Sequence, residues 1–398
     1  MTGPVVLRAA TVVVPDGIGP RWLTVHGGRI TEVGSGAPPA SGSTVDLAGR
    51  TVVPGFVDLH AHGGAGHDYS EGTAEAVRTA AGHHRARGTT TMLASLVALA
   101  PERLSRLVGL LAELTDDGVI AGSHVEGPWL SAGRPGAHDP ELLRDPEPDE
   151  LERVLAAGRG TVRMVTIAPE RPGGLEAIRR LAARGVVAAV GHTDADYELT
   201  RVAIEAGARV GTHLFNAMAP IHHRAPGPAV ALLEDPRVTV ELISDGVHVH
   251  PALFRRVLSD VGAGRIALVT DAMAASGCQD GRYRLGGIEV TVHEGVATVT
   301  GSARGTGSAT IAGGTATMAE LFALAVRTSN LPAPAALRTA VELTATTPAS
   351  VLGRTDIGAL RAGCWADLVV LDGDLKPVAV MHRGEWVSGS GSAIRPQV

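Results

Sequence analysis

From Thr51 onward, short apolar runs alternate with stretches in which apolar residues recur at helical spacing. This alternation is typical of βα units, in which helices connect buried parallel strands. The runs that predict strands are Thr51–Leu59, Thr89–Leu96, Val119–His124, Val162–Ala168, Gly185–Val190, Val210–Leu214, Val238–Ser244 and Ile266–Thr270. The segments that predict helices include Glu75–Arg87, Pro101–Thr115, Leu175–Ala183 and Pro251–Val261. Eight such units make a closed barrel, so the sequence predicts an α/β fold of the (β/α)8 TIM-barrel type.

The two ends of the chain have a different pattern. Residues 1–53 contain short segments of strand-like composition between turn residues, which predict strands at Val5–Arg8, Thr11–Val14, Trp22–His26, Arg29–Val33 and Thr44–Asp46. Strands are predicted again at Asp367–Leu371 and Val378–Arg383. We therefore expect a small β-sandwich domain built from both termini, residues 1–53 and 358–398, and a barrel at residues 54–357.

Composition narrows the class of protein. With 398 residues, 44% of them hydrophobic, the chain can bury a large core. No uninterrupted apolar run reaches the ~18–20 residues of a membrane span, and the first residues lack a signal-peptide pattern. The net charge of −6, without any basic cluster, argues against a nucleic-acid partner. Cys278 and Cys364 are far apart, so we expect no disulfide scaffold and a cytoplasmic location.

Lysine is nearly absent from this sequence. Lys376, near the C-terminus, is the single lysine, and the other basic residues are arginines. A Schiff-base lysine, a P-loop lysine or a carbamylated lysine between two metals would therefore have to be Lys376. The sixteen histidines, by contrast, include several at the ends of apolar runs.

Histidine and acidic side chains stand where five of the eight predicted strands end. They are His60, His62, His124, Glu126, His192, His213 and Asp271. Alternate residues of a strand point to one side, so the imidazoles of His60 and His62 face the same way. Barrel enzymes build their active sites at this end of the strands. Imidazoles together with carboxylates suit zinc, iron or another divalent transition metal, so the sequence predicts a metal site.

Each of these residues alone is compatible with a structural role, because a single histidine at a strand end is more often a core or surface residue than a ligand. Their coincidence on five strand ends favours the metal site. His124 can also lie beneath the metal and support a ligand. We expect structural or surface roles for His26, His67, His83, His84, His293 and His382.

The segments around these residues are similar to the motifs of a known family. Pro54–Gly63 resembles the first-strand signature of the amidohydrolase superfamily. Within it, the chain resembles the N-acetylglucosamine-6-phosphate deacetylase family along its whole length, most specifically at Glu126–Pro128 and His213–Met218. Many relatives bridge two metals with a carbamylated lysine, whereas this family uses a glutamate. That agrees with Glu126 and with the absence of lysine from the predicted barrel.

The resemblance implies metal-dependent hydrolysis of the N-acetyl amide of N-acetylglucosamine 6-phosphate, which gives glucosamine 6-phosphate and acetate. A divalent metal lowers the pKa of bound water and supplies hydroxide as the nucleophile. Asp271 matches the general base and acid of the family. The ligands of the main metal match Glu126, His192 and His213. His60 and His62 match a pair that holds a second metal in some members, so one or two ions are expected.

The resemblance also implies substrate contacts. His138 matches a residue placed against the substrate and is expected to donate a hydrogen bond to the oxyanion. Arg224 and His248 match the phosphate contacts, which a planar guanidinium suits. Further contacts are implied for Ala137, Asn216, Ala217, Ile311, Ala312 and Gly313. The loop Ser131–Gly136 contains glycine and proline and is either a movable lid or an ordinary exposed loop.

Several alternatives stay open. The substrate can be the galactosamine isomer, which differs at one hydroxyl. A cyclic-amide or N-acyl-amino-acid hydrolase of the same superfamily would not need Arg224 and His248. An inactive sugar-phosphate binder would have no reason to keep the full set of metal-binding residues. Zinc is the first choice of metal, and iron, manganese and cobalt are compatible with the same ligands. The resemblance implies a homodimer, in which the neighbouring subunit can supply a phosphate contact, and no nucleic-acid or membrane partner is expected.

Overall fold

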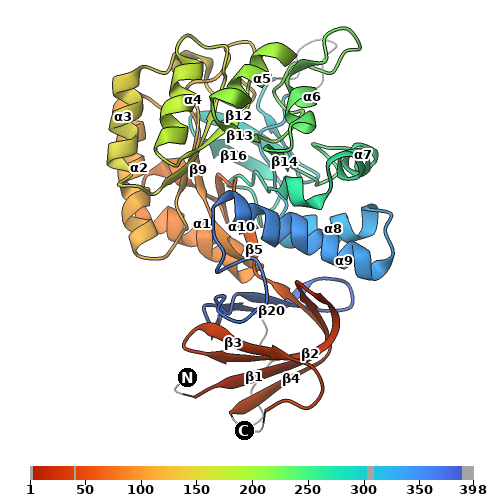
Figure 1. Ribbon diagram of the computed structural model, residues 1–398. Coiled ribbons are helices and arrows are strands. Elements are labelled where there is room, and N and C mark those ends of the chain that lie inside the picture. The colour runs from red at the N-terminus through yellow and green to blue at the C-terminus, as the bar shows by residue number, and fades with distance from the viewer. Residues whose placement is uncertain (1–2, 40–41, 303–308, 388–398) are drawn as a thin grey trace. The chain divides into compact units, whose positions relative to one another are not determined.

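The computed structural model describes residues 3–39, 42–302 and 309–387 (Figure 1). The chain forms two compact units. Of the described residues, one unit contains 3–39, 42–58, 84–91 and 317–387, and the other contains 59–83, 92–302 and 309–316. The domain boundaries at 53/54 and 357/358 stay a prediction, and residues 388–398 of the predicted β-domain lie outside the described residues.

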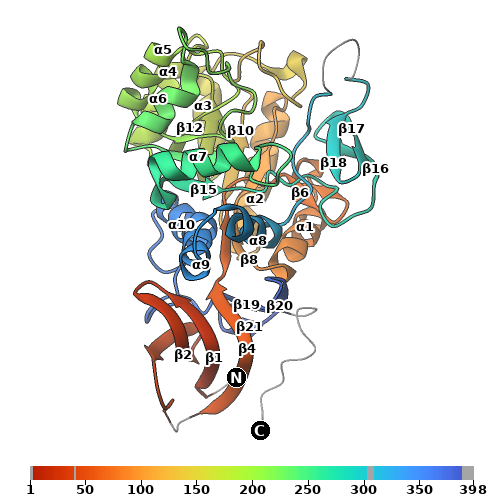
Figure 2. The same cartoon turned by 90° about the vertical axis from the view of Figure 1, so that its right-hand side faces the viewer.

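The second unit is built on a parallel sheet of seven strands in the order β15-β14-β13-β12-β11-β10-β9. These strands are β9 (Ala94–Leu96), β10 (Ser123–Glu126), β11 (Val162–Ile167), β12 (Val187–Val190), β13 (Ala208–Gly211), β14 (Thr239–Leu242) and β15 (Ile266–Leu268). The helices that alternate with them are α2 (Pro101–Asp116), α3 (Pro148–Ala157), α4 (Gly174–Ala183), α5 (Tyr197–Ala206), α6 (Gly227–Glu234) and α7 (Pro251–Val261). Figure 2 shows these helices around the outside of the strands. The predicted βα alternation is confirmed.

Local sequence explains where these helices begin and which face they bury. Helices α2, α3 and α7 each begin with a proline, whose fixed φ suits the first helical turn. At α5 the carboxylate of Asp196 accepts a hydrogen bond from the amide of Leu199 and caps the helix. Helix α2 buries Leu104, Leu107, Val108 and Leu111, which recur at helical spacing and face the sheet.

The two edge strands of the parallel sheet are joined by the segment that carries the first two candidate ligands. Ala61 forms a parallel bridge with Ala272, just after β15. Its carbonyl also accepts a hydrogen bond from the amide of Ser95 in β9, at 2.8 Å. The residues that flank Ala61 are therefore held beside both edges of the sheet.

A small antiparallel sheet follows β15. It consists of β16 (Gly281–Leu285), β17 (Ile288–His293) and β18 (Val296–Val299). Leu285, Val290 and Ala297 pack with Met273 and Ala312 in one buried cluster. The same unit contains a two-stranded sheet of β6 (Gly63–Gly64) and β7 (His67–Asp68) and three 3-10 turns, η1 (Tyr69–Glu71), η2 (Pro140–Leu142) and η3 (Ala263–Arg265).

The first unit contains a seven-stranded sheet in the order β21-β20-β19-β4-β1-β2-β3. Its strands come from both ends of the chain: β1 (Val5–Val14), β2 (Gly17–His26), β3 (Arg29–Gly34), β4 (Ser43–Pro54), β19 (Leu368–Leu371), β20 (Pro377–His382) and β21 (Glu385–Trp386). β1 and β4 pair in parallel, and the other neighbours pair antiparallel. This confirms that a separate β-sheet is built from both termini.

The apolar run Thr51–Leu59 differs from its prediction as one barrel strand. Its first half completes β4, in which Val53 pairs with Val369 of β19. Its second half forms the short β5 (Phe56–Asp58), which pairs with β8 (Thr89–Met92). The first unit also contains α8 (Met318–Thr328), α9 (Ala333–Val341), the π-helical turn η4 (Glu342–Thr346) and α10 (Thr347–Val351). Helix α1 (Ala74–Ala86) has residues in both units.

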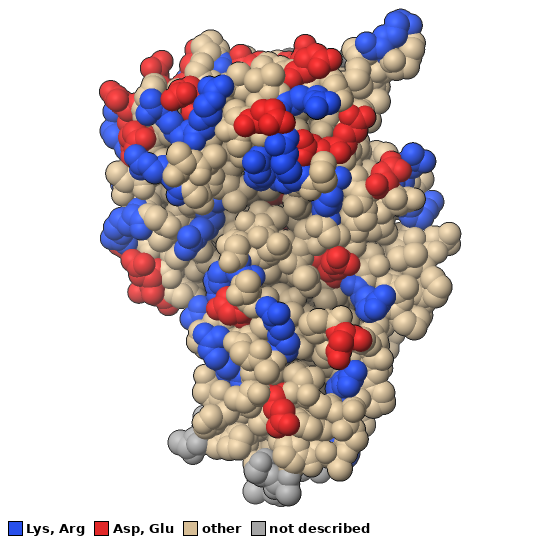
Figure 3. Space-filling model, viewed as in Figure 1, with Lys and Arg blue, Asp and Glu red and all other residues tan. Residues whose placement is uncertain are grey.

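Two observations concern the surface and the membrane. On the face in Figure 3, basic and acidic side chains are interspersed. Among the described residues, every helix is too short or too polar to cross a bilayer.

Candidate metal and active site

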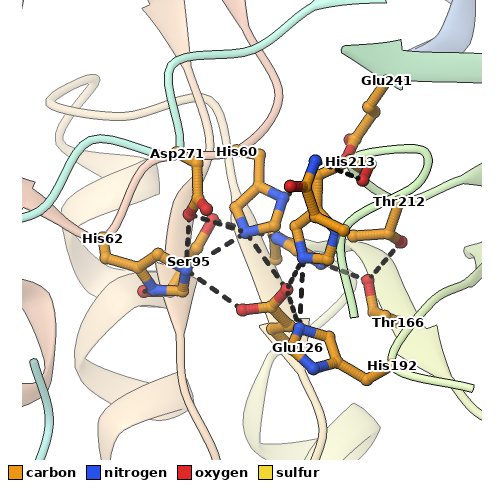
Figure 4. A network of polar contacts seen from close by, with 12 residues as sticks. His60, His62, Ser95, Glu126, Thr166, His192, Thr212, His213, Glu241 and Asp271 are labelled. Atoms are coloured by element: carbon orange, nitrogen blue, oxygen red, sulfur yellow. Dashed lines mark hydrogen bonds and ion pairs between the residues drawn. The ribbon is translucent and has the colours of Figure 1, made fainter. Parts of the chain in front are cut away.

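The predicted ligands converge at the carboxyl ends of the parallel strands (Figure 4). Glu126 ends β10, and the other ligands lie shortly beyond a strand end: His60 and His62 beyond β5, His192 beyond β12, His213 beyond β13 and Asp271 beyond β15. Each of the six residues is at most 9% exposed. Six ionisable side chains are thus buried together, an arrangement that needs mutual pairing or a bound ion.

Glu126 contacts several of the candidate histidine ligands. Its Oε1 atom is 3.2 Å from His192 Nε2 and 3.0 Å from His213 Nε2. Its Oε2 atom is 3.1 Å from His62 Nε2. Oε1 also lies 3.4 Å from His60 Nε2, so one carboxylate contacts four histidines of the cluster.

The six side chains form two groups of three. One group is Glu126, His192 and His213, and the other is His60, His62 and Asp271. In the second group, Asp271 Oδ1 is 3.4 Å from His60 Nε2 and 3.2 Å from His62 Nε2. Within each group the potential ligand atoms lie within 4.8 Å of one another.

Three of the ligand positions have a left-handed backbone. The φ angles are 47° at His192, 26° at His213 and 46° at Asp271. Residues with a Cβ atom rarely adopt such angles, so surrounding contacts must hold them. At Asp271 the amide donates to the carbonyl of His60 at 2.8 Å. Uncommon backbone conformations therefore aim these side chains at the centre.

Hydrogen bonds at Nδ1 determine which nitrogen of three histidines faces the centre. His62 Nδ1 lies 3.2 Å from the carbonyl of Ser95, and His192 Nδ1 lies 2.9 Å from the carbonyl of Arg134. A carbonyl only accepts, so each Nδ1 donates. His60 Nδ1 lies 3.2 Å from Glu241 Oε2 in the same way. In the neutral imidazoles the lone pair is then on Nε2 and points at the cluster, as in ligated histidines.

The electrostatics of the cluster favour a positive charge at its centre. Burial lowers the pKa of His62, but its hydrogen bonds to Asp271 and Glu126 outweigh burial and raise that pKa to about 9. Burial also opposes ionisation of Glu126 and Asp271, yet the nearby histidines hold the pKa of both carboxyls below their usual values. The Nε2 atoms of His60 and His62 lie 3.1 Å apart, and this set of nitrogen and carboxylate groups fits a divalent cation.

Sequence reasoning missed the residues that support the ligands. Glu241, fully buried in β14, contacts His60 through Oε2 and accepts from the amide of His213 at 3.2 Å through the same atom. Ser95 accepts from the amide of Ala61 at 3.1 Å. A charged residue inside the apolar run Val238–Ser244 was the one available signal for Glu241.

His124 has a supporting position. It belongs to neither ligand group. Its Nδ1 atom lies 2.9 Å from Ser95 Oγ and its Nε2 atom 2.9 Å from Thr166 Oγ1, which in turn bonds to Thr212. Burial, followed by the positive charge of His60, lowers its pKa well below the ordinary value. Both ring nitrogens are occupied by hydroxyls, so His124 supports the site without facing its centre.

A cavity of about 430 Å³ opens onto the ligands. Its lining includes His62, Glu126, His192, His213 and Asp271, together with the predicted contacts Ala137, His138, Asn216, Ala217, His248, Ile311 and Gly313. Ala312 instead packs in the buried cluster around Met273. Arg224 is exposed, does not line the cavity and donates to His223 Nε2 at 2.6 Å. The volume suits a small organic molecule.

His138 is held as a neutral hydrogen-bond donor. The amide of Ala98 donates to its Nδ1 atom at 3.1 Å, which leaves the proton on Nε2. That Nε2 atom lies 3.3 Å from Glu126 Oε2. Burial lowers the pKa of His138 to about 4, although Glu126 opposes the shift. His138 therefore presents an N–H group at the edge of the metal-ligand cluster.

His248 is paired with an acidic side chain at the cavity wall. Burial lowers its pKa, but the hydrogen bond and the charge of Asp245 outweigh burial and raise it above the ordinary value. Two short hydrogen bonds join His248 to Asp245: Nδ1 of His248 lies 2.8 Å from Asp245 Oδ2, and the amide of His248 donates to Oδ1 at 2.8 Å. The raised pKa favours the protonated imidazole, and in that form His248 suits an anionic group at the cavity wall.

Comparisons with known proteins agree with this geometry. Residues 51–389 match the Amidohydrolase family. The chain is 34% identical to the N-acetylgalactosamine-6-phosphate deacetylase of Escherichia coli O157:H7, over 96% of this chain and 99% of that one. It is 32% identical to the N-acetylglucosamine-6-phosphate deacetylase of Vibrio furnissii, over 93% and 91%. A point mutant of the Mycobacterium smegmatis N-acetyl-D-glucosamine-6-phosphate deacetylase, solved with N-acetyl-D-glucosamine-6-phosphate, is 54% identical, with a TM-score of 0.93 and coverage of 97% and 99%.

Proposed function

Because this chain belongs to the amidohydrolase family, we propose that it hydrolyses the N-acetyl amide of N-acetylglucosamine 6-phosphate to glucosamine 6-phosphate and acetate. The observation that carries the hydrolytic chemistry is the pair of buried ligand groups bridged by Glu126 at the cavity. The similarity to the Mycobacterium smegmatis enzyme supports the substrate. The Escherichia coli relative keeps the galactosamine isomer as the alternative.

The two ligand groups would hold one or two divalent cations. Glu126, His192 and His213 would hold the main ion, and His60, His62 and Asp271 a second. Nitrogen and carboxylate ligands suit zinc first and are compatible with iron, manganese or cobalt. When bound, such a cation lowers the pKa of water and polarises the amide carbonyl.

Asp271 is the proposed general base and acid. Its lowered pKa keeps the carboxylate ionised at neutral pH, ready to accept the proton of the attacking water. As the C–N bond breaks, the same carboxyl returns that proton to the amine nitrogen. His138 donates its Nε2 proton as a hydrogen bond to the oxygen on which negative charge develops.

The phosphate would bind at the cavity wall. His248 supplies positive charge, and Asn216 and Ala217 supply polar contacts there. Arg224 would act from the second subunit of a homodimer, because it does not line the cavity of its own chain and its neighbour Ile221 is 53% exposed. A monomeric enzyme with full activity on the phosphorylated sugar would exclude this role of Arg224.

The first test is release of primary amine and acetate by the metal-loaded protein. Three substrates are compared: N-acetylglucosamine 6-phosphate, its galactosamine isomer and unphosphorylated N-acetylglucosamine. We expect hydrolysis of the phosphorylated sugars, with the glucosamine isomer preferred. Equal rates on the phosphorylated and unphosphorylated sugars would contradict the proposed phosphate site. Faster hydrolysis of the galactosamine isomer would make that isomer the substrate.

A further inference from the structure

The cavity is lined in part by a cationic side chain, that of Arg134, to which no role is assigned so far. Among the described residues of the lining, Arg134 is the only arginine, and none is a lysine. Arginine stays charged at all physiological pH values, whereas His248 depends on Asp245 for its charge. An anionic substrate needs such a charge, so this inference rests on the proposed function.

Arg134 is held in place by a carboxylate of the neighbouring loop. Its Nε atom donates to Asp194 Oδ1 at 2.6 Å, and the hydroxyl of Ser131 donates to Asp194 Oδ2 at 2.9 Å. The amide of Asp194 is itself bound to Glu170 Oε1 at 2.7 Å. Gly133 fits between them because a Cβ atom at that position would overlap Asp194 Oδ2. The loop of Arg134 is therefore fixed to Asp194 by two side-chain hydrogen bonds, and Asp194 is fixed in turn by Glu170.

These contacts leave one edge of the guanidinium available. No hydrogen bond to another described residue involves Nη1 or Nη2 of Arg134. The two nitrogens form the planar fork that binds two oxygens of a phosphate. We propose that Arg134 is a phosphate-binding residue which this chain supplies to its own cavity, and that Asp194 is the positioning residue that orients it.

The loop of Arg134 contacts the wall at which the phosphate is expected. A Cβ atom at Gly136 would lie 3.8 Å from the Cβ atom of Ala217. The segment that carries Asp194 is bound to the same wall, because the amide of Thr193 donates to the carbonyl of Ala217 at 3.1 Å. Arg134 therefore reaches the cavity from the side of Asn216 and Ala217.

The backbone of Arg134 has a second contact, which the test must keep separate. Its carbonyl accepts the hydrogen bond from His192 Nδ1. A side-chain substitution leaves this carbonyl in place, so the orientation of His192 is retained. Loss of the guanidinium should therefore affect phosphate recognition and leave the metal content unchanged.

The experiment compares Arg134→Gln, Arg134→Lys and Asp194→Asn with the metal-loaded wild type. KM and kcat are measured on N-acetylglucosamine 6-phosphate and on the unphosphorylated sugar. Binding of inorganic phosphate is measured by calorimetry, and bound metal is counted. Arg78→Gln is the control, because it breaks an exposed pair with Asp117 that is 2.6 Å long and has no cavity contact.

We expect Arg134→Gln to raise KM for the phosphorylated sugar by roughly 10- to 100-fold, the value of a charged hydrogen-bonded pair. Its kcat/KM on the unphosphorylated sugar and its metal content should match the wild type. Arg134→Lys should restore part of the loss because it keeps the charge, and Asp194→Asn should give a smaller rise in KM because the guanidinium remains. Melting temperatures equal to that of the control would show that the variants are folded.

Two outcomes separate this proposal from the proposed function. If the wild type prefers the phosphorylated sugar and Arg134→Gln keeps that preference within twofold, the role of Arg134 is wrong and the function stands. If the wild type hydrolyses neither sugar, the phosphate titration decides. If the wild type binds phosphate and Arg134→Gln does not, the phosphate-binding role of Arg134 is supported although the proposed substrate is wrong. If the variant still binds phosphate, or if the wild type does not bind it, the role is wrong.

Discussion

Glu241 offers the sharpest test of how the ligand cluster is held. It is fully buried, and its Oε2 atom contacts both His60 Nδ1 and the amide of His213 at 3.2 Å. Its Oε1 atom has no hydrogen-bond partner among the described residues. In Glu241→Gln the amide oxygen can keep both contacts, so the change removes the negative charge and little else.

The structure predicts that this change lowers both metal affinity and the stability of the metal-free protein. A carboxylate that accepts from a ligating histidine makes the ring a better donor, and loss of such a partner weakens metal affinity by ~10- to 100-fold, or about 1.4 to 2.8 kcal/mol. In the metal-free protein the Glu241 carboxylate pairs with His60 Nδ1 at 3.2 Å, so its neutralisation also removes one partner of a buried ion pair. We therefore expect weaker metal binding together with a lower free energy of unfolding of the metal-free protein.

The assay is titration of the metal-free protein with zinc against a chromophoric chelator, with thermal unfolding measured separately. Glu150→Gln is the matched control, because Glu150 is 5% exposed and pairs with Arg144 away from the cluster. It should lower stability and leave zinc affinity unchanged. Wild-type zinc affinity in Glu241→Gln would refute the reasoning, as would a loss matched by Glu150→Gln.

Three further changes test the site. Asp271→Asn should lower kcat by ~10²- to 10⁴-fold, measured by amine release, with the protein still folded. Asp245→Asn removes the charge that raises the pKa of His248, so KM for the phosphorylated sugar should begin to rise at lower pH than in the wild type; a shared pH profile would contradict this. Gly136 has a φ of +56°, and the Cβ atom added by Gly136→Ala would lie 2.8 Å from His192 Cε1, so this change should lower zinc affinity. Gly82→Ala is the control, because its Cβ atom would meet no other atom within 4 Å and should leave zinc affinity unchanged.

The fold was predictable where a single periodicity governs a segment. The buried runs such as Val162–Ala168 match strands, because parallel strands covered on both faces are continuously apolar. The run Thr51–Leu59 was not predictable in the same way, because hydrophobicity does not show that its halves pair with different sheets. Pairing partners such as Val53 and Val369 are too distant in sequence for local pattern to reveal.

The site shows the same division. Ligands such as Glu126 could be identified because they stand at or just beyond the carboxyl ends of parallel strands, which lie at one edge of the sheet. Glu241 and Ser95 were missed because their partners come from other strands, and only the structure brings them close. Arg134 could not be identified for another reason: the role proposed for it depends on the carboxylate of Asp194, 60 residues later in the sequence.

The pairing of β4 with β19 has a consequence for how the chain is made. Pro54 and Leu368 are partners in this sheet, although roughly 300 residues separate them. At the ribosome's pace of about 5–20 residues per second, β4 waits about 15–60 s for its neighbour to be synthesised. During that time one edge of β4 is open to other chains. The nascent protein should therefore depend on chaperones most strongly late in translation.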